Sequence, residues 1–177
     1  MAAGRILGAV LAGGRSSRFG SDKAMAQMPD GRTLIDHAMA GLAPHVAHVV
    51  ICGRTGGLPD RPAPDMGPLG GLSAALHHAL VQGFDGVLTT GCDMPLYPAE
   101  LPAALIGEDA AILKGQQLLG WWPATLAPDL DAHLAADNNR SIHGWLDRIG
   151  ARVVDMPWLA LPNINRPEDL THWAEDD

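Results

Sequence analysis

Residues 6–23 have the sequence ILGAVLAGGRSSRFGSDK, and this stretch decides the predicted fold. Its first part, Ile6 to Leu11, is an apolar run with the length and composition of a buried strand. The loop that follows holds three glycines, which let the backbone approach a ligand and turn its N–H groups toward an anion. Three cations, Arg15, Arg18 and Lys23, lie within nine residues of the same loop. A strand followed by such a loop suits a polyphosphate and indicates a nucleotide enzyme.

The loop differs from the two commonest phosphate-binding motifs. A Walker A loop has four residues between its glycines and a Lys-Ser/Thr pair after the second. Here five residues separate Gly14 from Gly20, and Lys23 is followed by Ala24. The G-x-G-x-x-G fingerprint is also absent. A glycine-rich turn with solvated basic residues is the alternative interpretation, but this density of cations in an acidic chain favours phosphate binding.

Apolar runs alternate with helical patterns along the chain. We expect strands at 6–11, 48–52, 86–90, 110–113 and 152–156, and helices at 33–42, 69–80, 98–106, 141–149 and 167–173. Asn138 or Asn139 is the candidate N-cap of the helix at 141–149, and Gly150 is its candidate end. The alternation predicts an α/β fold with three α/β/α layers and a mostly parallel sheet. Ligands of such sheets bind beyond the carboxyl ends of the strands, so the segments after Leu11 and Thr90 should share one edge.

The composition narrows the class of protein. A chain of 177 residues suits a single domain, 1–177, and the formal net charge of −8 with no basic run argues against nucleic acid as a partner. No run of 18 apolar residues or secretory apolar region occurs, so we expect neither a membrane span nor export. Cys52 and Cys92 form no C-x-x-C motif and suit the cytoplasm. An acidic protein that holds a nucleotide needs local cations and a divalent metal.

A second chemical motif is Cys92-Asp93-Met94-Pro95, at the end of the strand expected at 86–90. A carboxylate at that place projects toward the ligand crevice, and oxygen ligands suit Mg²⁺ together with substrate phosphates and water. An Asp that caps a turn before Pro95 is the alternative. Opposite a glycine-rich basic loop, metal binding by Asp93 is the favoured interpretation.

The loop at 11–23 resembles the signature L-A-G-G-x-S-x-R-M-G-x-D-K of the molybdenum cofactor guanylyltransferases, with Phe19 at the usual Met. That family belongs to the wider nucleotidyltransferases, which include sugar-phosphate and cytidylyl enzymes. Three further segments resemble family motifs: DMGPLGGL at 65–72, NNRSIHGWL at 138–146 and NINRPEDL at 163–170. The resemblance spans most of the chain and implies a Rossmann-like nucleotidyltransferase fold.

The resemblance also implies roles for individual residues. It assigns catalysis to Lys23, Arg18 and Asp93, with Lys23 and Arg18 neutralising the α-phosphate and the leaving pyrophosphate, and Asp93 holding Mg²⁺. The N–H groups from Ala12 to Gly14 would cradle the phosphates. The implied nucleotide contacts are Leu11, Ala12, Gly13, Gly14, Arg15, Lys23, Asp65, Gly67, Pro68, Leu69, Gly70 and Asp93, and the implied pterin contacts are Arg140, Asn163 and Asn165.

Other positions leave alternatives open. Asp65 lies closer to the G-P-L turn than in some relatives. Some relatives also place an Asn where Cys52 falls, and a thiol cannot replace the donor and acceptor of an amide, so this chain would do without it or use backbone around Gly53. Three further sites have packing as an alternative or preferred role: Trp145 in a plain capped helix, the Trp121-Trp122 pair, which could otherwise stack on a pterin, and His77-His78.

The implied activity is transfer of GMP from GTP to the phosphate of molybdopterin, or of its molybdenum-loaded form, with release of pyrophosphate. Molybdenum-insertion proteins and apo-molybdoenzymes would be further partners. Cytidylyltransferases for the same pterin tend to have L-A-A-G in the loop and to lack G-P-L-G-G, whereas this chain has Gly13 and the turn at 67–71. The alternatives are a cytidylyl or sugar-phosphate enzyme and a non-catalytic nucleotide-binding module. The intact Lys23 and Asp93 argue against the last of these.

Overall fold

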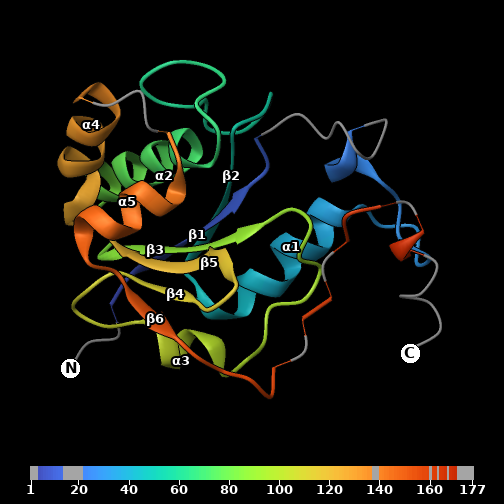
Figure 1. The fold of residues 1–177 in the computed structure, drawn as a ribbon. Coiled ribbons are helices and arrows are strands. Elements are labelled where there is room, and N and C mark those ends of the chain that lie inside the picture. The colour runs from blue at the N-terminus through green and yellow to red at the C-terminus, as the bar shows by residue number, and fades with distance from the viewer. Residues whose placement is uncertain are drawn as a thin grey trace.

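The computed structural model describes residues 4–13, 22–136, 140–159, 161–162, 164–166 and 168–170. Within them, one sheet has the strand order β2-β1-β3-β5-β4-β6 (Figure 1). Its strands are β1 (Ile6–Leu11), β2 (His48–Cys52), β3 (Gly86–Gly91), β4 (Ala111–Leu113), β5 (Gln116–Pro123) and β6 (Arg152–Val154). Only β5 runs antiparallel to its neighbours, β3 and β4. The predicted mostly parallel sheet is confirmed.

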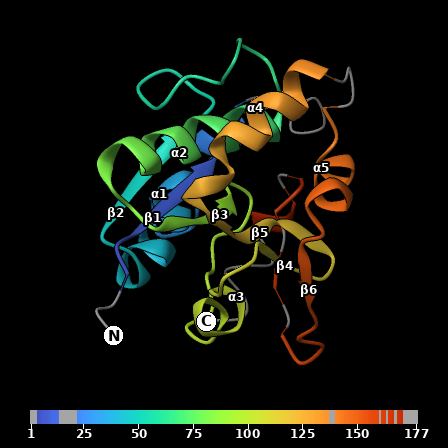
Figure 2. The same ribbon diagram turned by 90° about the vertical axis from the view of Figure 1, so that its left-hand side faces the viewer.

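Helices cover both faces of the sheet (Figures 1 and 2). One face carries α1 (Leu34–Leu42) and α3 (Leu101–Leu105), and the other carries α2 (Pro68–Gln82), α4 (Ala127–Ala136) and α5 (Ile142–Ile149). Successive strand residues point to opposite faces, so Leu7 and Ala9 of β1 enter one core while Val10 enters the other. The three-layer α/β/α fold is therefore confirmed.

Local signals set several element boundaries as predicted. Strands β1 and β2 have the predicted bounds. Helix α2 begins at Pro68 after Gly67, whose φ is 70°, and α5 ends at Gly150 in the left-handed conformation. The predicted N-cap at Asn138 or Asn139 is wrong, because Ser141 caps α5 by accepting a hydrogen bond from the Gly144 N–H at 3.1 Å.

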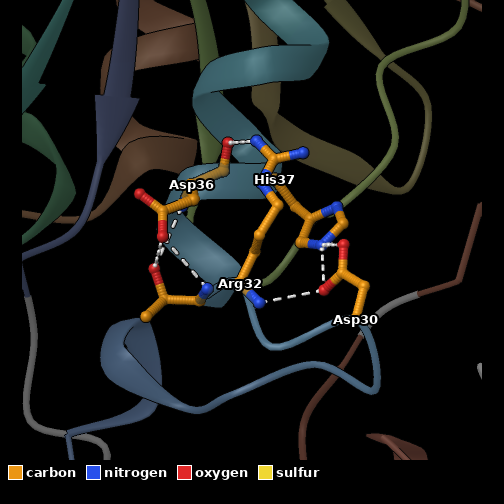
Figure 3. A network of polar contacts seen from close by, with 5 residues as sticks. Asp30, Arg32, Asp36 and His37 are labelled. Carbon is orange, nitrogen blue, oxygen red and sulfur yellow. Dashed lines mark hydrogen bonds and ion pairs between the residues drawn. The ribbon is translucent and has the colours of Figure 1, made fainter.

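The start of α1 is fixed by a network of neighbouring polar groups (Figure 3). The Asp36 N–H donates to the Thr33 hydroxyl, and the Thr33 N–H donates to the Asp36 carboxylate, which forms a capping box. The Arg32 guanidinium donates to the Asp36 carbonyl, and His37 lies 2.9 Å from the Asp30 carboxylate. Hydrogen bonds from Thr33 lower the pKa of Asp36, and the His37 contact lowers the pKa of Asp30. We call these residues, 30–37, the α1 network.

Several boundaries differ from the prediction. Strand β5 and helix α4 were not predicted, and α3 is shorter than the range 98–106. Strand β5 shows no alternation because both of its faces are covered: Trp121 enters one core and Trp122 the other. The strand predicted at 152–156 ends at Val154. Of the helix predicted at 167–173, residues 169–170 are helical, and Pro167 and 171–173 lie outside the described residues.

Candidate functional site

The site lies at the carboxyl ends of β1, β2 and β3. In the sheet register Leu11 is opposite both Cys52 of β2 and Gly91 of β3, so the segments that follow these strands begin side by side. The expectation that the residues after Leu11 and Thr90 share one edge is confirmed. The Ala12 N–H donates to the Cys52 carbonyl at 3.0 Å, so in this structure it is not free to bind a phosphate.

Three predicted site residues from distant parts of the chain meet at this edge. Lys23, in the 3₁₀ helix η1 (Lys23–Met25), has its Nζ 3.3 Å from Asp93 Oδ2 and 3.1 Å from Asn165 Oδ1. The chain after β6 returns to η1 to supply Asn165 (Figure 1). The Lys23 side chain is 14% exposed and that of Asp93 25%, so this ion pair is better shielded from water than a surface pair. The edge therefore holds a lysine, a carboxylate and an amide in direct contact.

Packing holds Asn165 in place. The Ile164 N–H donates to the Asp93 carbonyl at 3.1 Å, and the Ile164 side chain is buried with Met28 and Leu34. Leu34 is the first residue of α1, and its N–H donates to the carbonyl of Ala26, the residue after η1. The start of α1 therefore adjoins the segment that carries Lys23. Asn165 is therefore positioned by the buried neighbour Ile164 and by its own N–H, which donates to Asp169 Oδ2 at 2.8 Å.

A second ion pair lies beside the first. The Arg54 guanidinium donates to Asp22 Oδ1 at 3.3 Å and to Oδ2 at 2.5 Å, and Asp22 directly precedes Lys23. Burial raises the pKa of the Cys92 thiol to about 11; Asp93 and Asp22 raise it further, while Lys23 and Arg54 lower it. The charges of both ion pairs therefore act on the Cys92 thiol. With this raised pKa, Cys92 is protonated at neutral pH and is a poor nucleophile.

A pocket of about 660 Å³ opens next to these charges, in the long loop between β2 and α2 that projects beyond the sheet in Figure 1. Its lining residues include the predicted contacts Asp65 and Gly67 and also Arg54 and Asp60, which the sequence analysis did not select. The volume lies within the usual range for small-molecule sites and is large enough to admit a nucleotide base.

Asp60 is the functional candidate that sequence reasoning missed. Its Oδ2 accepts a hydrogen bond from the Met66 N–H at 3.2 Å, whereas its Oδ1 is buried with no hydrogen-bond partner in the described part of the chain. Burial raises the pKa of the Asp60 carboxyl, against the lowering effect of the Met66 N–H, and the Asp65 charge raises it further. Such an unpaired oxygen is costly, and it marks a place where a donor from a ligand would be stabilising.

Glycines make room for Asp60. A Cβ at Gly53 would lie 2.7 Å from Gly13 Cα and 3.0 Å from Asp60 Oδ1, and a Cβ at Gly70 would lie 2.9 Å from Asp60 Cγ. Asp65, in contrast, is exposed and has a φ of 58°. Gly13, Gly53 and Gly70 lie on three separate segments, and their common proximity to one carboxylate is visible only in the folded chain.

The thiol of Cys52 does not line the pocket. Cys52 is fully buried in the core that contains α2, and burial raises its pKa to about 12, with a further contribution from Asp60. The next residue, Gly53, lines the pocket, and its N–H already donates to the Leu58 carbonyl at 2.9 Å. The sequence left open whether this chain does without the missing amide or uses the backbone around Gly53. In this structure the Gly53 N–H is already hydrogen-bonded and so is not free to replace it.

The remaining predicted residues divide into three groups. Leu11 and Leu69 are buried core residues at the ends of β1 and α2, and Pro68 opens α2. Arg140 is exposed just before the Ser141 cap. The residues Gly14, Arg15, Arg18 and Asn163 lie outside the described residues.

The alternative packing roles are confirmed for three side chains. Trp121, Trp122 and Trp145 are all buried in the two cores. His77 on α2 contacts the Asp131 carboxylate of α4 at 2.7 Å, away from the pocket lining.

Two features of the described residues bear on ligands and membranes. They contain no group of three or more His, Cys, Asp or Glu side chains placed to hold a metal ion, so a metal at Asp93 would take its other ligands from substrate and water. Their helices include none long and apolar enough to cross a lipid bilayer.

A mostly parallel α/β sheet with a lysine–carboxylate pair and a pocket at its carboxyl edge is typical of nucleotide-binding proteins. Residues 8–153 match the family model described as the MobA-like NTP transferase domain. The molybdenum cofactor guanylyltransferase of Sinorhizobium fredii is 34% identical over 97% of this chain and 92% of its own length. The chain therefore belongs to the MobA-like NTP transferase family, and it is a nucleotidyltransferase.

Solved structures show the same fold. Molybdopterin-guanine dinucleotide biosynthesis protein A from Archaeoglobus fulgidus has a TM-score of 0.70 at 22% identity, over 96% of this chain and 97% of its own. A manganese complex of Rv0371c from Mycobacterium tuberculosis has a TM-score of 0.54 at 16% identity, over 98% of this chain and 100% of its own. The family and fold inferred from the sequence are thus confirmed.

Proposed function

We propose that this enzyme transfers GMP from GTP to the phosphate of molybdopterin, or of its molybdenum-loaded form, and releases pyrophosphate. The observation that carries the proposal is the Lys23–Asp93 pair beside a base-sized pocket, in a chain that matches a molybdenum cofactor guanylyltransferase over nearly its full length. The free thiols Cys52 and Cys92 suit the reducing cytoplasm, where we place the reaction.

The pocket supports guanine as the base. The Watson–Crick edge of guanine presents neighbouring N–H donors, and a carboxylate accepts two such donors at once. We assign this role to Asp60, whose Oδ1 lies unpaired at the Gly13–Gly53 contact, with Asp65 at the exposed rim of the pocket. Gly67 and Pro68 would place the start of α2 against the base.

The contacts among Lys23, Asp93 and Asn165, which we call the charged edge, support transfer at the α-phosphate. A phosphate acceptor is already a competent nucleophile, so positioning and charge stabilisation carry most of the catalysis. Lys23, with Arg18 from the preceding loop, would neutralise charge on the α-phosphate and the pyrophosphate. Asn165 touches Lys23 and so would lie where the acceptor phosphate meets the nucleotide, with Arg140 and Asn163 as the further pterin contacts.

The donor atoms at this edge fit a hard divalent cation. Asp93 Oδ2 and Asn165 Oδ1 both accept hydrogen bonds from the Lys23 ammonium, and two oxygen atoms facing a positive charge support a cation at this place. We propose Mg²⁺ as the ion and Asp93 as its protein ligand; the manganese complex of the Mycobacterium tuberculosis neighbour supports a divalent metal. The bound ion would supply charge neutralisation at the phosphate oxygens.

The test is the identity of the product. The enzyme is incubated with GTP, Mg²⁺ and molybdopterin, and the products are analysed by mass spectrometry. We expect a product with the mass of molybdopterin joined to GMP, in amounts equal to the pyrophosphate released. A product formed from a sugar phosphate, with none from molybdopterin, would overturn the proposal.

A further inference from the structure

The Arg54–Asp22 ion pair lies on the path that a bound nucleotide would have to follow. Arg54 lines the base-sized pocket in the loop after β2, while Asp93 follows β3, and β1 lies between these two strands in the sheet. A nucleotide with its base in the pocket and its α-phosphate near Asp93 therefore crosses the end of β1. Asp22 holds the Arg54 guanidinium and directly precedes Lys23, so this ion pair connects the pocket loop to the Lys23–Asp93 pair.

The burial and charge of the pair point to an exchangeable contact. The Arg54 side chain is 22% exposed and that of Asp22 is 53% exposed, so the carboxylate partner is open to water and can leave the arginine without being stranded in the interior. Arginine binds phosphate with the same bidentate geometry that it uses for a carboxylate. A phosphate chain with several negative charges can therefore replace Asp22 on Arg54 at small cost.

We propose that Arg54 binds the triphosphate of the nucleotide and that Asp22 occupies Arg54 in the free enzyme, so that nucleotide binding exchanges the carboxylate for phosphate. This inference rests on the proposed function, since it requires a nucleotide in this site. It gives Arg54 and Asp22 opposite effects on affinity: Arg54 raises it and Asp22, as the competing anion, lowers it. A pair that only braced the two loops would give both residues the same effect.

The experiment measures dissociation constants by calorimetry for two probes, GTP and inorganic tripolyphosphate. We expect Arg54→Gln to weaken both probes by about tenfold or more, and Arg54→Lys to recover part of that loss. We expect Asp22→Asn to bind both probes roughly two to five times more tightly. The double variant should bind the probes much as Arg54→Gln does, because the main effect of Asp22 is exerted through Arg54.

Two matched controls remove the same charges elsewhere. Arg5→Gln removes an arginine that precedes β1 at the opposite edge of the sheet, and Asp155→Asn removes the carboxylate of the exposed Lys114 pair. Neither should change the affinity for tripolyphosphate. Melting temperatures of all variants report whether they fold; should Arg54→Gln not fold, Arg54→Lys and Asp22→Asn carry the test.

The outcomes separate this inference from the proposed function. Unchanged affinity in Arg54→Gln, or weaker binding in Asp22→Asn, would overturn the inference while leaving guanylyl transfer in place. A wild-type enzyme that binds neither GTP nor tripolyphosphate would overturn both. A wild-type enzyme that binds tripolyphosphate but prefers another nucleotide would contradict only the choice of GTP.

Discussion

The α1 network and the charged edge are both polar, but they are built differently. In the α1 network the partners lie within eight residues of one another, and the pKa values of Asp36 and Asp30 are lowered. At the charged edge, Lys23 contacts Asp93, 70 residues away in the sequence, and Asn165, 142 residues away. In the pocket beside this edge, Asp60 has an oxygen with no hydrogen-bond partner among the described residues and a raised pKa. The first arrangement stabilises the fold by itself, whereas the second holds groups that a ligand can satisfy.

The largest effect that tests this difference is expected at Asp93. Asp93→Ala should reduce turnover at physiological Mg²⁺ by about 100-fold or more, because it removes the proposed metal ligand and the partner of Lys23. The melting temperature should change little, since the side chain is partly exposed. Pyrophosphate release and calorimetric melting measure the two quantities. Near-normal turnover in a folded variant would contradict the metal assignment.

A smaller effect on function is expected at Asp60, where a substitution should weaken GTP binding but stabilise the fold. Asp60→Asn should weaken GTP binding by about tenfold, because an amide accepts fewer hydrogen bonds from guanine than a carboxylate does. The same change should raise the melting temperature at pH 7 by roughly 1–3 °C. Titration calorimetry and thermal melting report these changes.

The sign of the Asp60 stability effect follows from its raised pKa. The ionised carboxyl is the form that burial penalises, so the cost is present above the folded-state pKa and disappears as the pH falls through that value. The stability advantage of Asp60→Asn should therefore shrink on acidification. An Asn variant that is less stable than the wild type at pH 7 would contradict the unpaired state of Oδ1.

In the α1 network we expect a substitution to change the stability of the fold and to leave ligand binding unchanged. Thr33→Ala should lower the free energy of unfolding by about 1 kcal/mol through loss of the capping box, with little change in the affinity for GTP. The lowered pKa of Asp36 stabilises the fold above its unfolded value of 3.8, and this contribution is lost as the pH falls through the lower folded value. Denaturant unfolding at pH 7 and at pH 3 measures the loss of stability and its pH dependence, and titration calorimetry measures the affinity for GTP. A large loss of GTP affinity would show that the two regions are not separate.

The smallest effect is expected for Asp30→Asn, which removes the exposed partner of His37. Exposed pairs of this kind contribute little, so the melting temperature should shift by no more than about 1 °C and turnover should not change. A marked loss of turnover would move the α1 network into the functional site.

The same contrast explains which features the sequence predicted. Strand β1, helix α2 and the Gly150 stop follow from local patterns and were predicted. Strand β5 was missed because QQLLGWWP is covered on both faces, and helix α4 because its sequence, APDLDAHLAA, has only a weak apolar stripe. Asp60 was missed because its neighbours Gly13 and Gly53 approach it only in the folded chain. The family resemblance assigned both Lys23 and Asn165 to the site, but their direct contact was not predicted, because 142 residues separate them in the sequence.

The most direct test of guanylyl transfer is pyrophosphate release with molybdopterin and Mg²⁺, compared among GTP, CTP, ATP and UTP. We expect release with GTP alone, because Asp60 offers acceptors for the paired donors of guanine. Release with CTP instead would assign the enzyme to cytidylyl transfer, and no release with any of the four, while GTP still binds, would contradict guanylyl transfer to molybdopterin.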